Sequence, residues 1–97
     1  MMIENYLLEE LVAFAKYKTI SATAEHLSIT QPAVTRGMQK LEELLNVKLF
    51  NRTRNRITLT KTGELAAKEA EKILEMQQEF IEYVQNFNKT YHQIKIY

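Results

Sequence analysis

Apolar residues recur at spacings of three and four along most of this chain of 97 residues, and this period predicts amphipathic α-helices. The pattern covers four stretches, residues 3–16, 20–27, 31–45 and 61–87. In the first of these helices we expect the acidic residues to lie on the outer side, away from the core. Only two Gly and one Pro are present, so few turns interrupt the helices and a mainly α fold is expected.

The predicted helix at 31–45 has well-marked ends and an unusual outer face. Thr30 can cap it through its side-chain oxygen, and Pro32 lies in the first turn, where a helix does not need its N–H. Asn46 follows the last turn, where a left-handed backbone ends many helices. The inner stripe is formed by Val34, Met38, Leu41 and Leu45. The outer face, whose composition suits contacts to base edges, is formed by Gln31, Ala33, Thr35, Arg36, Gln39 and Lys40.

The helices at 20–27 and 31–45 together match a helix-turn-helix. Thr19 can cap the shorter helix, and the turn between the two is Ser28-Ile29-Thr30, with Ile29 expected to anchor it to the core. In such a motif the first helix crosses the DNA backbone and the second enters the major groove. Two helices joined by a short turn are also common in helical domains without this function, so the pattern alone leaves both interpretations open.

Between the third and fourth helices the apolar period falls to two, which predicts a small β-hairpin. Residues 47–50 and 56–60 are the expected strands, and residues 51–55 form a basic tip. Two short strands are not stable by themselves, so the apolar side chains of the hairpin should pack against the helices. These side chains are Leu49, Phe50, Ile57 and Leu59.

The formal net charge of +1 is concentrated in the middle of the chain. Residues 31–62 carry seven basic and two acidic residues, a local charge of +5 that suits a phosphate backbone. Three of these basic residues should project from the hairpin: Arg52, Arg54 and Arg56. Arginine in this position commonly binds phosphates or a narrow A·T-rich minor groove, and a solvated basic loop is the alternative interpretation.

The last predicted helix, at 61–87, is about 40 Å long at 1.5 Å per residue, which is too long to be buried on one small domain. Thr60 can cap its start. A heptad-like seam follows one face: Ala66, Ala70, Ile73, Gln77, Phe80, Val84 and Phe87. We expect the seam to pair with the same helix of a second subunit; the alternative is a helix that folds back on its own domain. After residue 87 the pattern changes, and residues 92–97 alternate like the start of a strand.

The residue types argue against an enzyme. The chain has no Cys and no Asp, and His26 and His92 are too far apart to suggest a metal-binding pair. No apolar run approaches the roughly 18 residues of a membrane span, and the N-terminus does not resemble a secretory signal. A cytoplasmic protein is therefore expected, with no membrane partner, no metal and no cofactor bound to this stretch.

Several motifs resemble, in order and spacing, the N-terminal domain of LysR-type transcriptional regulators, and the resemblance covers about residues 7–87. The motifs are Thr19–Leu27, Thr30–Arg36, Leu41-Glu42, Leu49-Phe50-Asn51-Arg52 and Leu59-Thr60-Lys61-Thr62-Gly63. The chain departs from the family pattern at Lys18-Thr19, Thr23-Ala24 and Asn46, where the family often has Gly-Ser, Ala-Ala and Gly. Because Thr and Asn keep the capping and the backbone geometry, the departures at Thr19 and Asn46 leave the expected fold unchanged.

The resemblance implies a winged helix-turn-helix, built of three helices and a two-stranded wing, at residues 1–60. A linker helix that dimerises would occupy residues 61–87. Residues 88–97 would form a hinge, with 93–97 as the first strand of an effector-binding domain that is cut off here. The family pattern places Gln31, Pro32, Ala33, Thr35 and Arg36 in the major groove and Arg52 and Arg54 at phosphate or minor groove. Further DNA-binding candidates on the same faces and at the start of the second helix are Gln39, Arg56, Thr19 and Ser21.

The implied function is sequence-specific binding of a homodimer to an interrupted, two-fold-symmetric, A·T-rich promoter operator. RNA polymerase would be a further partner of the whole regulator. Two alternatives remain: a protein-interaction module that uses the long apolar helix, and the DNA-binding domain of a molybdate-responsive type of regulator. The sequence does not specify the operator, the regulated genes, the direction of regulation, the effector or the oligomeric state beyond a dimer.

Overall fold

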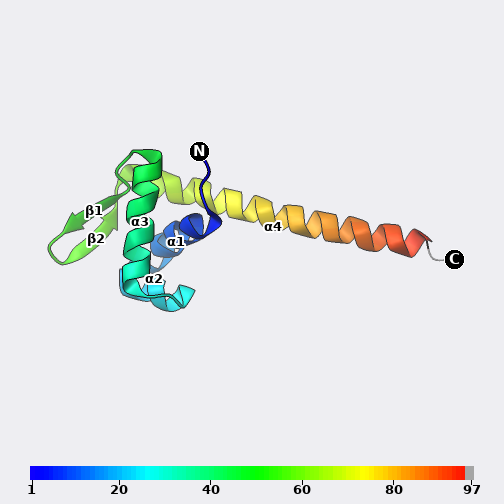
Figure 1. The fold of residues 1–97 in the computed structure, drawn as a ribbon, viewed down its shortest axis with the longest axis horizontal. Coiled ribbons are helices and arrows are strands. Elements are labelled where there is room, and N and C mark those ends of the chain that lie inside the picture. The colour runs from blue at the N-terminus through cyan, green and yellow to red at the C-terminus, as the bar shows by residue number, and fades with distance from the viewer. Residues whose placement is uncertain (96–97) are drawn as a thin grey trace.

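The computed structural model describes residues 1–95, and the side chains of residues 1–93. Six elements follow one another along the chain: α1 (Asn5–Tyr17), α2 (Ile20–Leu27), α3 (Gln31–Leu45), β1 (Phe50–Thr53), β2 (Arg56–Leu59) and α4 (Lys61–Lys95). The first three helices and the hairpin gather at one end, and α4 extends away from them, so the molecule is 68 Å long and 26 Å wide (Figure 1). This is the winged helix-turn-helix with a long last helix that the sequence predicts.

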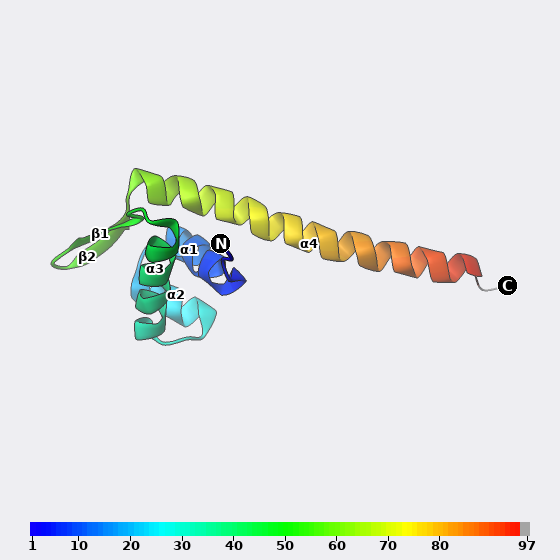
Figure 2. The same cartoon turned by 45° about the horizontal axis from the view of Figure 1, so that its top comes forward.

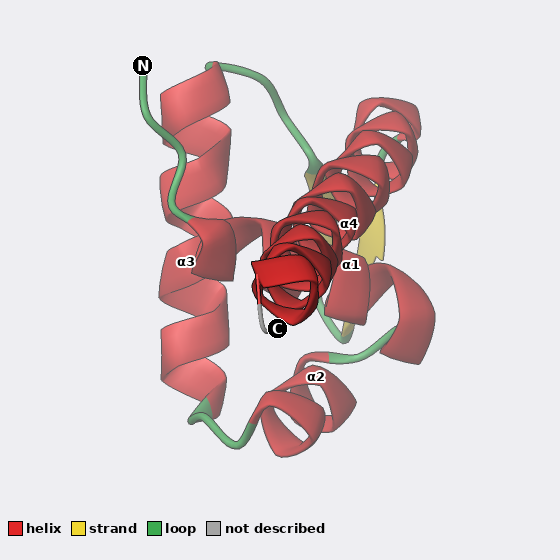
Figure 3. Cartoon of the chain, turned by 90° about the vertical axis from the view of Figure 1, so that its right-hand side faces the viewer, coloured by secondary structure: helices red, strands yellow, loops and turns green. Residues whose placement is uncertain are grey.

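The core lies around α1, which contacts α2, α3 and α4. In Figure 3, α4 points toward the viewer and α1 lies behind it, with α3 to the left and α2 below. Each element contributes apolar side chains, and the ring of Phe14 on α1 meets Phe50 of the hairpin edge to face at a centroid distance of 5.6 Å. Burying a side chain of this size contributes about 1.5–3 kcal/mol. The buried apolar residues are Leu7, Leu11, Phe14, Ala24, Val34, Met38, Leu41, Leu49, Phe50, Ala67 and Ala70.

Three threonine caps fix where the later helices begin, as expected from the sequence. The hydroxyl oxygens of Thr19, Thr30 and Thr60 accept the backbone N–H groups of Ala22, Ala33 and Gly63 at 3.0, 3.2 and 2.9 Å. Each such cap contributes about 1 kcal/mol. At the other end of α3, Asn46 takes the left-handed conformation that a helix end requires, with φ of 53°.

The hairpin starts later than the alternation of residues suggests. The predicted first strand at 47–50 is wrong, because pairing begins at Phe50, opposite Leu59, and ends with Thr53 opposite Arg56. Residues 46–49 are used to leave α3: the Val47 N–H donates back to the carbonyl of Glu42 at 3.3 Å. The expected packing of the hairpin is confirmed, since Leu49 and Phe50 are buried and Ile57 and Leu59 pack against the core.

Two further expectations for single residues are wrong. Ile29 does not anchor its turn to the core, because 37% of its surface remains exposed. Glu10 does not lie on the outer side of α1 but is 5% exposed. Since α1 is covered by three other helices, little of its surface is left outside, and the missing side chain of Gly37 on α3 leaves room for the Glu10 carboxyl.

The helix α4 is longer than predicted. It continues to Lys95, so the expectation of a hinge and a starting strand is wrong for residues 88–95, and residues 96 and 97 lie outside the described residues. No Gly or Pro follows Gly63, and no strand pairs with this stretch within the described part of the chain. Figures 1 and 2 show that only the first turns of α4 lie against the other helices. None of the helices in residues 1–95 combines the length and apolar character needed to cross a bilayer.

Candidate nucleic-acid interface

The exposed face of α3 carries the side chains that the sequence selected. Gln31, Pro32, Arg36 and Gln39 are exposed, and Ala33 and Thr35 are half-buried at the edge of the face. The inner stripe of Val34, Met38 and Leu41 is buried as predicted, whereas Leu45 at the end of the helix is half-buried. Because the cap at Thr30 holds the first turn in place, these polar groups sit on a rigid element. The N-terminal half of α3 is therefore free to meet another surface.

Two outer residues of α3 are partly engaged within the chain. The Thr35 hydroxyl donates to the carbonyl of Gln31 at 3.2 Å, which leaves only its lone pairs for another donor. Lys40 forms a salt bridge with Glu4 at 2.7 Å and lies near the hydroxyl of Tyr6. The hydrogen bond to Glu4 is the main cause of the raised pKa of Lys40, with a smaller contribution from Tyr6. Lys40 thus ties α3 to the start of the chain, while Arg36 lacks such a partner among the described side chains.

The start of α2 offers a second polar patch. Thr19 and Ser21 are both exposed there. The first N–H groups of a helix have no intrahelical acceptor and suit anions, although the Thr19 oxygen already satisfies the N–H of Ala22. Thr23, whose partner the sequence did not reveal, is buried and donates its hydroxyl to the carbonyl of Thr19 at 2.7 Å.

The hairpin of β1 and β2, which carries the three arginines, projects to one side of α3 (Figures 1 and 2). All three side chains are exposed, but their partners differ. Arg52 forms a salt bridge with Glu42 of α3 at 3.1 Å. Within residues 1–93, neither Arg54 nor Arg56 has a carboxylate at salt-bridge distance. The positive charge of the tip is therefore available to a partner.

The comparisons with known proteins agree with this arrangement. The family model for the bacterial regulatory helix-turn-helix protein of the lysR family matches residues 6–64, which is more than half of the chain. The chain belongs to the LysR family. The function of such a domain is DNA binding in transcription regulation, not enzyme catalysis. The molybdate-responsive alternative loses its support, because the matching relatives and structures are LysR-type proteins.

Relatives match this LysR-family chain over most of its length. The uncharacterized HTH-type transcriptional regulator YbhD of Escherichia coli (strain K12) is 36% identical over 85 residues, which are 88% of this chain and 26% of that protein. The HTH-type transcriptional regulator TcbR of Pseudomonas sp. (strain P51) is 38% identical over 69 residues, 71% of this chain and 24% of that protein. The chain spans about a quarter of the length of the curated relatives it matches.

Solved structures with DNA share the fold. The crystal structure of the CbnR_DBD–DNA complex is similar with a TM-score of 0.82 and 32% identity, covering 87% of this chain and 97% of that one. The crystal structure of Vibrio fischeri DarR in complex with DNA is similar with a TM-score of 0.83 and 29% identity, covering 92% of this chain and 30% of that one. The LysR-family domain described here is thus a DNA-binding regulator domain with a long C-terminal helix.

The predicted seam on α4 is divided between two environments. Ala70 is buried and Ala66 half-buried against the domain's own core, and Gln77 exchanges side-chain hydrogen bonds with Asn5 of α1. The alternative of a helix folded back on its own domain therefore describes the first part of α4. The remaining seam residues are exposed, with Phe80 at 69%: Ile73, Phe80, Val84 and Phe87.

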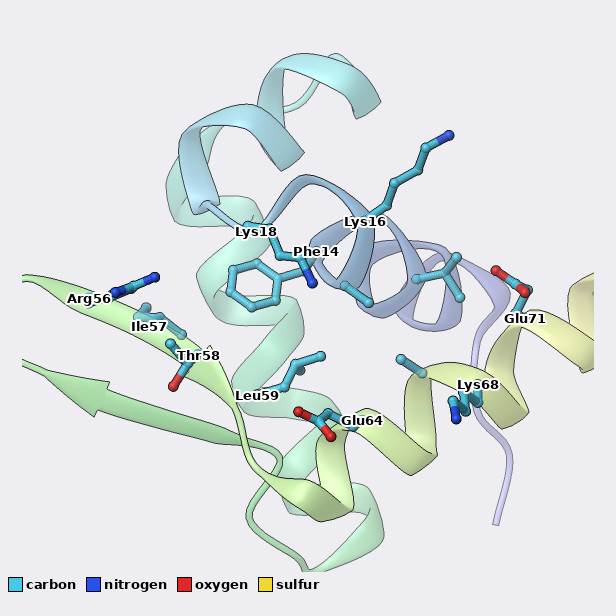
Figure 4. A pocket seen from close by; sticks show the side chains of 13 residues that line it. Phe14, Lys16, Lys18, Arg56, Ile57, Thr58, Leu59, Glu64, Lys68 and Glu71 are labelled. Atoms are coloured by element: carbon cyan, nitrogen blue, oxygen red, sulfur yellow. The ribbon is translucent and has the colours of Figure 1, made fainter.

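A groove of about 730 Å³ lies between α1, β2 and α4 (Figure 4). Its floor is apolar, formed in part by Phe14, Ile57 and Leu59, and Lys18 and Arg56 lie at its edge. Of the residues that the sequence singled out for DNA, only Arg56 lines this groove. The exposed face of α3 and the groove are therefore separate features of the domain.

Two acidic residues whose side chains lie between α3 and another element were not recognised from the sequence. Glu10 is buried against α3, and a signal for this was present, because it falls on the same helical stripe as Leu7 and Phe14. Glu42 connects α3 to the hairpin. Its place in the Leu-Glu motif pointed to the family but not to this contact, which depends on the path of the chain after α3.

Proposed function

We propose that this domain binds promoter DNA as a homodimer, with α3 in the major groove and the wing at neighbouring phosphates or in the minor groove. The observation that carries the proposal is that Arg54 and Arg56 have no ion-pair partners among the described side chains and belong to a hairpin that projects beside α3 (Figures 1 and 2). In such an arrangement the helix in the major groove reads the base sequence, and the basic arm on the adjacent backbone adds affinity that does not depend on sequence.

The roles of the single residues follow from their chemistry. Gln31 can form two hydrogen bonds with adenine, and Pro32 and Ala33 can contact a thymine methyl group. Thr35 and Arg36 reach phosphate or guanine, and Gln39 lies one turn further along the same face. At the start of α2, Thr19 and Ser21 are candidates for a phosphate.

The second half of α4 supports the homodimer. Several large apolar side chains follow one another on it without cover from their own domain, and such patches usually mark an interface. Two copies related by a two-fold axis would read two half-sites, separated by whole turns of about 10.5 base pairs, on an interrupted A·T-rich palindrome.

The chain's share of its relatives' length supports a larger regulator. We infer an effector-binding domain that follows α4, RNA polymerase as a partner of the whole protein, and the cytoplasm as its location. The residues of this chain do not identify the effector.

A second candidate function is a protein-interaction module, which the exposed apolar row of α4 would serve by itself. A helix pair does not need the basic residues of α3 and the wing, so DNA binding separates the two candidates.

The deciding experiment exposes the purified protein to a pool of random DNA duplexes at moderate salt and sequences what is retained. Enrichment of a two-fold-symmetric A·T-rich motif is expected, and its half-site spacing gives the geometry of the dimer. Retention without a motif would remove sequence reading from the proposal. No retention at low salt would favour the interaction module.

A further inference from the structure

A single carboxylate joins α3 to the wing, which is the hairpin formed by β1 and β2. Glu42, in the last turns of α3, accepts the backbone N–H groups of Leu49 and Phe50 on one oxygen at 2.9 and 3.1 Å. Its other oxygen accepts the Arg52 guanidinium at 3.1 Å. The Glu42 side chain is only 15% exposed. All three donors belong to the segment that leads into and forms β1.

These contacts fill a gap in the backbone hydrogen bonding. Leu49 lies after the end of α3, and Phe50 is the first residue of the paired strand. Neither the helix nor the hairpin supplies acceptors for both of their N–H groups. Partial burial by itself raises the pKa of the Glu42 carboxyl, but these amides and Arg52 together lower it below its ordinary value. The carboxylate is therefore held in its charged form as an acceptor for the wing.

The arginines of the wing differ in whether they pair with Glu42. Arg52 is engaged with the protein, whereas Arg54 and Arg56 at the tip are not, within the described side chains. The side chains of Leu49 and Phe50 are fully buried, and this apolar burial attaches the hairpin to the core separately from the carboxylate. What the carboxylate adds is the direction in which the tip leaves α3.

We propose that Glu42 is a positioning residue, which fixes the wing relative to α3 so that Arg54 and Arg56 meet the backbone while α3 occupies the groove. This inference rests on the proposed contact between the wing and DNA. In this proposal Arg52 holds the wing against Glu42 and does not serve as a free charge for DNA.

The test compares Glu42→Gln with Glu43→Gln. Both variants remove one negative charge from neighbouring positions of α3, but the Glu43 side chain is exposed and makes no hydrogen bond or ion pair within the described residues. Any general gain in DNA affinity from the lost charge is thus the same in both. The probe is a duplex of about 40 base pairs carrying the motif enriched from the random pool, long enough for two half-sites.

Glu42→Gln is expected to bind this duplex about tenfold more weakly than Glu43→Gln, with a shallower salt dependence. Hydroxyl-radical protection of the DNA backbone should be lost where the wing lies and kept at the sugars on either side of the groove that α3 occupies. In hydrogen exchange without DNA, the Leu49 and Phe50 amides should lose at least tenfold protection in Glu42→Gln alone. Equal binding and equal protection in the two variants would overturn the proposal.

Two further measurements keep the result interpretable. If Glu42→Gln does not fold, the wild-type amide signals of Leu49 and Phe50 are followed by NMR as the pH is lowered. The two signals must titrate together, with a midpoint below the ordinary pKa of Glu. Independent or absent titration refutes the proposed contact of Glu42 with both amides. Arg54→Ala tests the wing itself. If Arg54→Ala loses the wing protection and Glu42→Gln does not, only the role of Glu42 fails; if Arg54→Ala changes nothing, the proposed wing contact fails.

Discussion

Replacing Glu10 by Gln is expected to stabilise the folded domain at pH 8, although the residue lies in the core. Its carboxyl is buried between α1 and α3, close to the backbone of Gly37. One of its oxygens has no hydrogen-bond donor among the described residues. Burial, and to a smaller extent the charge of Glu9, raises the pKa of Glu10 from 4.5 to about 7. At pH 8 the folded protein must therefore hold an unpaired negative charge.

The size of the effect follows from the two pKa values of Glu10. Each unit of difference between folded and unfolded states corresponds to about 1.4 kcal/mol. Because the folded state binds the proton more tightly, stability is highest below pH 4.5 and falls as the pH rises to about 7. The neutral amide of Gln avoids this loss. The gain from the substitution should be about 3 kcal/mol at pH 8 and about 1 kcal/mol at pH 5.

The assay is urea denaturation followed by circular dichroism at pH 5, 6, 7 and 8. Glu25→Gln is the matched control, because Glu25 is exposed on α2 and has no ion pair within the described side chains. Its effect should stay within about 0.5 kcal/mol at every pH. A gain from Glu10→Gln that is the same at pH 5 and pH 8 would mean that packing, not ionisation, is responsible. No gain at pH 8 would refute the burial of a charged group.

Four other substitutions test the fold and the interface. Gly37→Ala places a Cβ atom 1.7 Å from the Glu10 oxygen and should lower the stability by about 1–3 kcal/mol in thermal unfolding. In a Glu10→Ala background the same substitution should cost little or nothing, and an equal cost in both backgrounds would contradict the contact. Gln31→Ala should lower discrimination at one base position by about 1–3 kcal/mol in competition binding. Arg54→Ala should weaken binding to all sequences alike and make the slope of log affinity against log salt concentration shallower by about one. The same uniform loss of affinity for both variants would refute these roles. Phe80→Glu should turn the proposed dimer into a monomer in analytical ultracentrifugation while the unfolding of the domain is unchanged. A dimer that persists in this variant would exclude the exposed apolar residues of α4 as its interface.

Local chemistry was sufficient to predict the helix-turn-helix. The bounds 20–27 and 31–45 were predicted correctly, because a threonine oxygen that caps the first turn and a residue that tolerates a left-handed backbone at the end act within a few residues of the helix. The concentration of charge on residues 31–62 was likewise visible, since it needs only the order of the residues. The motifs that resemble the LysR family lie in these same segments, which is why the family could be recognised without coordinates.

The structure alone decided features that depend on which elements meet. Strand pairing starts at Phe50 because the turn after α3 and the carboxylate of Glu42 use the preceding residues. Glu10 is buried because a glycine faces it from another helix. The seam of α4 is divided because α1 covers only its first turns. Periodicity along a chain states which side chains share a face, but the partner of that face, and hence its burial and charge, is set by contacts between residues distant in sequence.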